Sequence, residues 1–290
     1  MKILVVGDLH GQKPKIHFKD FDAIIAPGDF CSDAPREYIF RALREHLENP
    51  DSEVKWYDYI GRRKATEMLK TSIRDGRRIL EFLDSFGVPV YAVPGNWEPM
   101  GSRKRSELAF ARVNRWKDML NGLENVVDVH YKRRTINRDF DVVGYGVVSG
   151  PEYPQYKEDL KMYDKRELKS LKTKFNRTKK RLSKLFVKAK RPVIFMPHNV
   201  PFNTSLDKIT NKESPKYGYH YGSVLAREMI ERYQPLLCIG GHMHEHFGRD
   251  KIGKTVCINA GFGKKVNTLI DLDENKGKIR SIKFHPRIYG

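Results

Sequence analysis

Residues 1–11, MKILVVGDLHG, join an apolar run to a polar turn that ends in Gly7-Asp8 and His10. A short apolar run of this kind, closed by a turn, predicts a buried β-strand. The pattern recurs in FDAIIAPGD at 21–29, VPVYAVPGN at 88–96, RPVIFMPHN at 191–199 and PLLCIGGHMH at 235–244. The sequence therefore predicts five buried strands, each followed by Asp, Asn or His.

Amphipathic helical segments separate several of these strands, and strand–helix alternation predicts an α/β architecture. Helical spacing is found before the third and fifth strands, at Ile73, Leu80, Leu83 and Phe86 and at Leu225, Met229, Ile230 and Tyr233. Further segments read as strands, and helical signals are weak after Phe247; these strand segments are 125–131, 140–148, 254–259, 266–272 and 278–284. Together they predict a β-sandwich with flanking helices. No internal repeat or Gly/Ser-rich linker divides the chain, which favours one domain over residues 1–290.

The composition is that of a folded protein. Of the 290 residues, 39% are hydrophobic and 31% are charged, which supports a real core and excludes general disorder. No apolar run approaches 18 residues, and the N-terminal one is too short for a signal peptide, so we expect neither a membrane span nor a membrane partner. Three widely spaced cysteines without a C-x-x-C pair predict free thiols and a cytoplasmic protein.

The formal charge of +19 is concentrated in one segment. Residues 164–191 contain 13 Lys and Arg against Asp164 and Glu167, a local charge of +11. Apolar residues recur there at spacings of three and four, which predicts an amphipathic helix within a basic insertion at about residues 157–191. Such a helix is either a solvated surface element or an arm that binds nucleic acid or a partner helix.

The predicted strand ends carry the side chains that are expected to perform chemistry. Ligands of open α/β sheets bind outside the carboxyl ends of the strands, so these side chains should converge. Oxygen and imidazole donors suit Mn, Fe, Zn or Ni rather than Ca, and seven are too many for one tetrahedral ion. The number fits two divalent ions that share one carboxylate. The candidate ligands are Asp8, His10, Asp29, Asn96, His198, His242 and His244.

The order of these motifs, GD-x-HG, GD, GN-x-E, H and GH-x-H, resembles that of the calcineurin-like metallophosphoesterase superfamily over nearly the whole chain. The stretch HNVPFNTSLD at 198–207 and the turn HYGS at 220–223 are similar to a prokaryotic branch of predicted phosphoesterases. The resemblance implies a four-layer α/β/β/α sandwich with mixed sheets. It also implies a metal-dependent phosphoric ester hydrolase in which a hydroxide that bridges two metals attacks phosphorus.

The same resemblance implies a division of the ligands. It places Asp8, His10, Asp29 and His244 on one metal. It places Asp29, Asn96, His198 and His242 on the other, so that Asp29 bridges. Manganese is the favoured metal, and Fe, Zn and Ni are alternatives. Asn96 is thereby both a ligand and a catalytic candidate.

One position departs from the family pattern, because Trp97 stands where a His usually follows Gly-Asn. In the resembling enzymes that His assists the leaving group, so its role must pass elsewhere or be dispensable. His220 is one catalytic and substrate-binding candidate, unless it is a loop residue unrelated to chemistry. Trp97 is another candidate for substrate binding, as a flat wall for a nucleobase or sugar, unless it is a buried anchor. Glu98 is expected to orient its neighbours rather than bind metal.

These features favour hydrolysis of phosphodiesters. A singly charged diester suits a site of modest net charge, and Trp97 suits a nucleotide-like substituent. Phosphomonoesters remain an alternative substrate class. Two other functions stay open: a nuclease that uses the basic helix to bind nucleic acid, and a catalytically weak binding scaffold with this fold.

Overall fold

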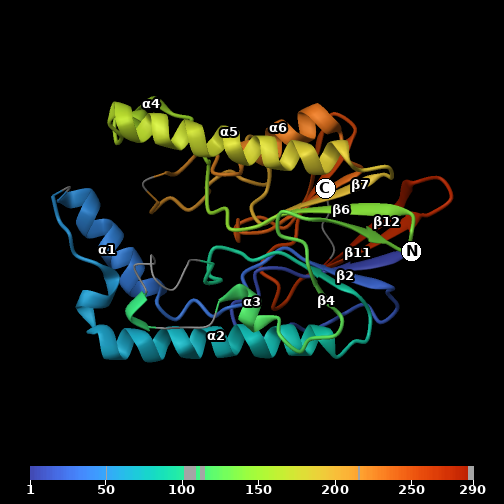
Figure 1. Ribbon diagram of the computed structural model, residues 1–290, viewed down its shortest axis with the longest axis horizontal. Helices are drawn as coiled ribbons and strands as arrows, with labels where there is room; N and C mark the ends of the chain where they lie inside the picture. Colours follow the sequence, from blue (N-terminus) through green and yellow to red (C-terminus); the bar gives the residue numbers. More distant parts are fainter. Residues whose placement is uncertain (50, 101–108, 112–114, 215, 287–290) are drawn as a thin grey trace.

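The computed structural model describes residues 1–49, 51–100, 109–111, 115–214 and 216–286 (Figure 1). Two six-stranded sheets face each other, and helices cover their outer faces. This is the four-layer α/β/β/α arrangement with mixed sheets that the sequence predicts.

The first sheet contains four parallel strands at its centre and one edge, extended by two antiparallel strands. In spatial order it comprises β12 (Lys278–His285), β11 (Asn267–Asp273), β1 (Lys2–Val5), β2 (Ala23–Ala26), β3 (Val90–Ala92) and β4 (Val126–Asp128). The second sheet also has four parallel strands, but they lie between two antiparallel edge strands. It comprises β5 (Arg133–Ile136), β6 (Phe140–Tyr145), β7 (Val193–Pro197), β8 (Leu237–Gly240), β10 (Thr255–Asn259) and β9 (Gly248–Ile252).

Long helices form the two outer layers (Figure 1). Helix α2 lies on the first sheet, and α5 and α6 lie on the second. The helices are α1 (Arg36–Glu48), α2 (Arg62–Asp84), α3 (Trp116–Met119), α4 (Lys157–Leu160), α5 (Lys165–Val187) and α6 (Val224–Tyr233), with 3₁₀ turns η1 (Trp56–Tyr59) and η2 (Ala109–Ala111).

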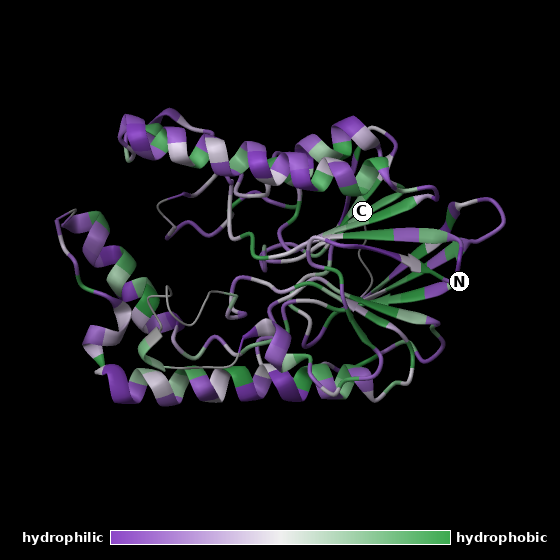
Figure 2. Ribbon diagram, viewed as in Figure 1, coloured by the Kyte–Doolittle hydropathy of each residue, from purple (hydrophilic) through white to green (hydrophobic). Residues whose placement is uncertain are grey.

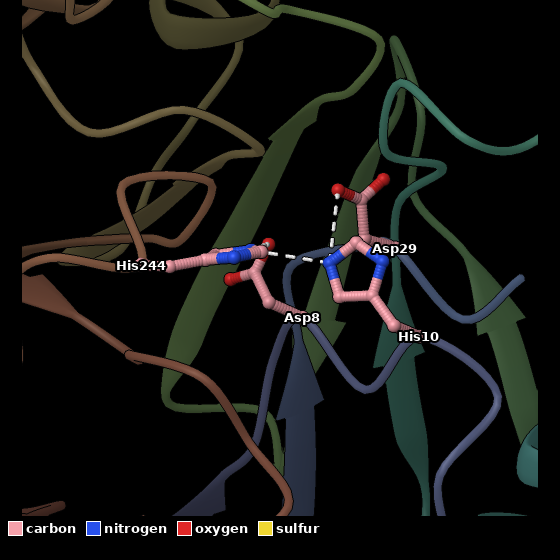
Figure 3. A group of neighbouring side chains, drawn as sticks. All are labelled: Asp8, His10, Asp29 and His244. Carbon is pink, nitrogen blue, oxygen red and sulfur yellow. Dashed lines mark hydrogen bonds and ion pairs between the residues drawn. The ribbon is translucent and has the colours of Figure 1, made fainter. Parts of the chain in front are cut away.

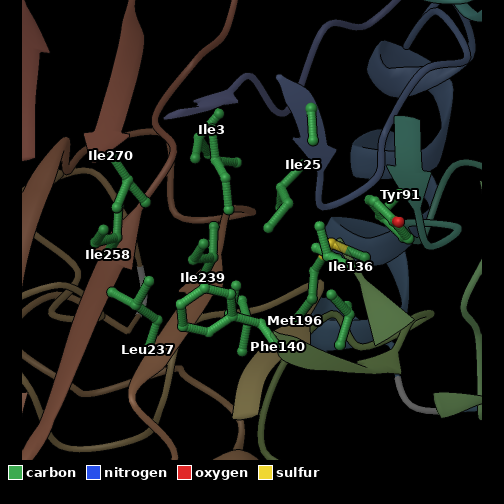
Figure 4. Packing of buried hydrophobic residues seen from close by; sticks show 14 of the residues in the cluster. Ile3, Ile25, Tyr91, Ile136, Phe140, Met196, Leu237, Ile239, Ile258 and Ile270 are labelled. Atoms are coloured by element: carbon green, nitrogen blue, oxygen red, sulfur yellow. The ribbon is translucent and has the colours of Figure 1, made fainter. Parts of the chain in front are cut away.

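Side-chain alternation along the strands produces three apolar layers. Ile3 and Val5 of β1 point into the core between the sheets, whereas Leu4 points to the helical side. The central core contains branched residues from both sheets (Figure 4). Because every central strand is covered on both faces, it reads as a continuous apolar run in the sequence.

The five strands that end in polar motifs are confirmed, as is the basic helix. Helix α5 begins with a capping box, in which the Asp164 carboxylate accepts from the backbone N–H of Glu167 at 2.7 Å and the Glu167 carboxylate accepts from that of Asp164 at 2.8 Å. Its apolar stripe is buried through Phe175, Leu182 and Phe186. Helix α1 and strands β5 and β9 are elements that the sequence pattern does not predict.

The three cysteines are buried and free, as expected. Within the described part of the chain, no helix combines the length and the apolar character needed to cross a membrane.

Candidate metal centre

The predicted ligands follow strands of both sheets. Asp8, Asp29 and Asn96 come after β1, β2 and β3, whereas His198 and His242 come after β7 and β8. The carboxyl ends of these parallel strands meet at one edge of the sandwich, so residues far apart in the sequence become neighbours. The predicted convergence therefore has a structural basis in the strand order.

One group of donors contains Asp8, His10, Asp29 and His244, whose ligand atoms all lie within 4.8 Å of one another (Figure 3). The Nε2 atoms of His10 and His244 are 3.1 Å apart. His10 Nε2 is also 3.7 Å from Asp29 Oδ2, and His244 Nε2 is 3.6 Å from Asp8 Oδ1. Imidazole and carboxylate lone pairs that point at one small space are the donor set of a divalent transition metal.

A second group contains Asp29, His198 and His242, again with ligand atoms within 4.8 Å of one another. His198 Nε2 lies 3.4 Å from Asp29 Oδ2 and 3.0 Å from Asn96 Oδ1. Asn96 is thereby brought beside the group. Asp29 belongs to both groups, which is the arrangement expected of a carboxylate shared by two ions.

Backbone carbonyls orient two of the imidazoles. His198 Nδ1 is 2.8 Å from the carbonyl oxygen of Pro27, so this nitrogen donates and leaves the Nε2 lone pair for the site. His242 Nε2 is 3.0 Å from the carbonyl oxygen of Ser149, which assigns its lone pair to Nδ1. The backbone N–H of His242 also donates to both oxygens of Asp8, at 2.9 Å each. Metal ligands are usually held by such outer contacts.

The backbone around these residues is unusual. Asp8, His10, Asp29 and His242 all adopt positive φ angles, of 50°, 44°, 57° and 69°. Residues other than glycine seldom do so, and such strain is concentrated at functional sites. Gly95 allows the close approach of Asp29, because a Cβ atom there would lie 2.0 Å from Asp29 Oδ1.

Burial and charge shape the protonation of the metal-free cluster. Burial opposes ionisation of Asp29, yet the nearby His198, His10 and His242 hold its pKa well below the usual range. Burial likewise opposes protonation of His198, but the charges of Asp29 and Asp8 raise its pKa to about 9. Burial and the charge of His198 lower the pKa of His242 to about 4. A divalent ion bound here would therefore displace the proton of His198.

Glu98 orients its neighbours, as the sequence predicts. Its side chain is 4% exposed and accepts hydrogen bonds from the backbone N–H groups of Asp29, Phe30, Cys31 and Gly95. Burial and the charge of Asp29 raise the pKa of Glu98 to about 7. The carboxylate thus fixes the turn that carries the shared ligand.

Aromatic rings flank His10 on two sides. The ring of Trp97 meets it edge-on with centroids 6.2 Å apart, and Phe262 stacks on it at 5.7 Å. Trp97 is partly buried against the apolar layer under α2, which fits the anchor role considered for it. Sequence reasoning missed Phe262, because no local pattern marks a single aromatic residue between two glycines.

His220 lies outside both donor groups. Its Nδ1 is 2.7 Å from Oδ1 of the fully buried Asp207, which fixes the ring through this nitrogen. The next residue, Tyr221, is tied to the centre because its carbonyl accepts from the side-chain amide of Asn199, the neighbour of His198. Sequence reasoning missed the role of Asp207, although this residue closes the motif at 198–207.

Comparisons with known proteins find one matching family model and several similar solved structures. The family model described as calcineurin-like phosphoesterase matches residues 1–246, whereas no curated protein matches the chain. One solved structure has a TM-score of 0.57 and 16% identity, over 98% of this chain and 97% of its own. The TT1561 protein of Thermus thermophilus has a TM-score of 0.45 and 16% identity over 97% of both chains. A phosphopantetheinyl hydrolase of Mycobacterium tuberculosis has a TM-score of 0.47 and 12% identity over 90% of both chains.

Proposed function

The chain belongs to the calcineurin-like phosphoesterase family, and on this premise we propose that it hydrolyses phosphodiesters with two divalent ions at the seven predicted ligands. Family membership implies a metal-dependent phosphoester hydrolase. The observation that carries the fuller proposal is the presence of Asp29 in both donor groups. Manganese is the proposed metal, with Fe, Zn and Ni as alternatives suited to the same donors.

The ligand residues have separate tasks in this proposal. When bound, two divalent ions supply Lewis-acid polarisation of the phosphoryl oxygens and an acidified water. Asp8 and Asp29 contribute two negative charges, which leaves a doubly occupied site positive and attractive to a phosphate anion. The carbonyls of Pro27 and Ser149 hold the imidazoles in place, and Glu98 holds the turn of Asp29. The chain thereby fixes its donors before substrate arrives.

Phosphodiesters are preferred over monoesters for two reasons. A diester carries one negative charge, which suits a site whose net positive charge is modest. The partly buried ring of Trp97, edge-on to His10, offers an apolar surface for a substituent such as a nucleoside. A nucleotide-like phosphate ester is therefore the proposed substrate.

His220 is the proposed general acid for the leaving group. Asp207 accepts from the ring and also from the backbone N–H groups of Asn203, Thr204 and Gly222, so the carboxylate is itself fixed. A carboxylate that holds one ring nitrogen sets the imidazole tautomer and leaves the other nitrogen free to exchange protons. The loop of His220 is joined to that of His198 through Asn199 and Tyr221. These contacts support a role for His220 in protonating the departing oxygen.

The alternatives have weaker support. A nuclease that binds single strands would use exposed aromatic rings for stacking, yet Phe175 and Phe186 of α5 are buried. A binding scaffold without activity would have no need for so many convergent metal donors. We retain two further sequence-based expectations as part of the proposal: one domain over residues 1–290 with a basic insertion at about 157–191, and a cytoplasmic location suited to the free cysteines.

Turnover of two aryl esters tests the function. With manganese, the protein should hydrolyse bis(p-nitrophenyl) phosphate with a higher kcat/KM than p-nitrophenyl phosphate. Asp29→Asn should lose both activities, whereas the matched variant Asp51→Asn should keep them, because Asp51 is exposed and distant in sequence from every ligand. Metal binding without any turnover would favour the scaffold, and a faster monoester would reverse the substrate assignment.

A further inference from the structure

Exposed apolar side chains are concentrated at the end of the molecule that carries the metal centre. Eleven large apolar residues of the described chain are exposed. All of them belong to segments that follow the carboxyl ends of β2, β3, β6 and β7, but Val187 stands apart, because it lies at the far end of α5, close to the start of β7. These segments leave the sheets at the same edge as the metal ligands. An apolar surface placed in this way is a sign of an interaction site.

Helix α1 provides the larger of two apolar patches. Ile39, Phe40, Leu43 and Leu47 recur at helical spacing and are 37%, 47%, 50% and 49% exposed, whereas Ala42 is the buried residue of this helix. An amphipathic surface helix normally packs its apolar side against the core, whereas the apolar side of α1 is exposed to water. Figure 2 shows hydrophobic residues on α1 at the edge of the molecule.

The second patch follows α4 on the other side of the same end. Leu160, Met162 and Tyr163 are 38%, 62% and 40% exposed. In Figure 1, α1 lies next to one end of α2, and α4 lies next to one end of α5. Both are at the end of the molecule where the carboxyl ends of the parallel strands lie. The two patches therefore lie on opposite sides of the end that carries the ligands. A broad surface could contact both of them together.

Charge distinguishes the possible occupants of these patches. Helix α5 begins two residues after Tyr163 and contains ten Lys and Arg against Glu167, and the whole chain carries +19. A second copy of the chain would bring another +19 and would be repelled. A nucleic acid would satisfy the cations but would leave the apolar side chains in water. An anionic lipid surface suits both the apolar patches and the basic helix, because it buries apolar side chains and attracts cations.

We propose that the protein binds anionic lipid bilayers, with the apolar side of α1 and the segment 160–163 as anchors and the basic helix α5 as electrostatic support. The sequence-based expectation of no membrane partner rested on the absence of a span, and surface binding requires none. The ligand-bearing end would then face the bilayer. A lipid-borne phosphoester as substrate is a consequence that rests on the proposed function, whereas the binding itself does not.

Vesicle co-sedimentation tests the proposal. The full chain should bind vesicles of phosphatidylglycerol and phosphatidylcholine, bind pure phosphatidylcholine weakly, and dissociate as salt is raised. The double variant Phe40→Ser/Leu43→Ser and the single variant Met162→Ser should each lower the partition coefficient, the first by about tenfold or more. Val187→Ser is the matched control, because Val187 is 74% exposed at the opposite end of α5, and it should bind like the wild type.

Three results would overturn the proposal. One is a wild type that ignores anionic vesicles at low salt; another is equal loss of binding in Val187→Ser. The third is a concentration-dependent dimer in sedimentation velocity that the α1 variant abolishes, which would make a second copy the occupant. Circular dichroism confirms that each variant is folded. Asp29→Asn should still bind vesicles, so failure of the hydrolase assignment and failure of lipid binding are read separately.

Discussion

The carboxylate of Glu98 accepts a hydrogen bond from the backbone N–H of Asp29 at 3.0 Å, so one buried acid holds the residue that both donor groups share. Three more backbone donors, from Phe30, Cys31 and Gly95, lie at 2.8, 2.9 and 2.5 Å. These donors come from the turns after β2 and β3. The position of the shared ligand therefore depends on a side chain that is not itself in either donor group.

Replacement of Glu98 should disturb both stability and metal binding. In Glu98→Gln, the amide NH₂ faces backbone donors and leaves buried groups unpaired, which should lower the free energy of unfolding by about 2–4 kcal/mol. Metal affinity should fall as well, because the turn of Asp29 loosens. Urea unfolding and metal titration measure the two effects. Glu124→Gln is the exposed control, and equal behaviour of the two variants would contradict the role of Glu98.

Gly95 should tolerate no side chain. A Cβ atom there would lie 2.0 Å from Asp29 Oδ1 and 2.4 Å from the Asp29 nitrogen, so Gly95→Ala should displace the shared carboxylate. We expect the proposed phosphodiesterase activity to fall by about 10²-fold or more, as misplaced catalytic groups usually cause. Gly87→Ala is the control: nothing lies within 4 Å of a Cβ atom there, so the strain of its φ of +69° should lower stability without displacing Asp29. Wild-type metal affinity in Gly95→Ala would refute the steric argument.

The fold was largely predictable because buried parallel strands are apolar on both faces. Strands such as β7 therefore stand out as continuous runs, and their ends locate the ligands. Strand β9 was missed because it is an edge strand whose exposed Arg249 and Lys251 break the apolar pattern. Helix α1 was missed for a related reason, since its apolar residues do not pack on the core. In both β9 and α1, the apolar and polar residues do not follow the pattern of an element packed on the core, so the local sequence does not reveal the element.

The candidate site could also be predicted only in part from the sequence. The clustering of the candidate ligands could be predicted, because they follow parallel strands whose carboxyl ends the topology places together. The roles of Phe262 and Asp207 could not be predicted, because they depend on side-chain contacts with His10 and His220 that no local pattern encodes. Tertiary contacts of single residues leave no periodic signal in the chain.

His130 should make stability depend on pH. Burial, aided by Arg181 and Lys132 and opposed by Asp128, lowers the pKa of His130 to about 4, and its Nδ1 accepts from the Gly146 N–H. In the unfolded chain, His130 takes up a proton near the ordinary pKa of about 6.5. The contribution of the neutral, buried ring to the free energy of unfolding is therefore complete above that pH. It should be lost as pH falls from about 6.5 to 4, by about 3 kcal/mol.

Unfolding by urea across this pH range checks the prediction for His130. The variant His130→Gln cannot titrate, so its stability curve should be flatter than that of the wild type between pH 4 and 6.5. Parallel curves would show that other groups cause the pH dependence.

His220 should matter most for poor leaving groups. His220→Ala should lower kcat/KM for alkyl diesters more than for aryl diesters, by up to about 10²–10⁴-fold, because alkoxide departure needs a proton. Trp97→His should do little if His220 is the acid and should restore activity on alkyl diesters if no acid is present. The measurement is the slope of log kcat/KM against the pKa of the leaving group, for the wild type, His220→Ala and Trp97→His. Identical shallow slopes in all of them would exclude both residues from this role.

The proposed sharing of Asp29 between two ions is tested most directly by metal stoichiometry. Mass spectrometry of the manganese-loaded wild type should find about two ions per chain, as the donor groups require. Asp29→Asn should lose both ions, His242→Ala should retain one, and the exposed control Asp51→Asn should retain both. Two ions bound to Asp29→Asn with wild-type affinity would contradict the shared-carboxylate centre.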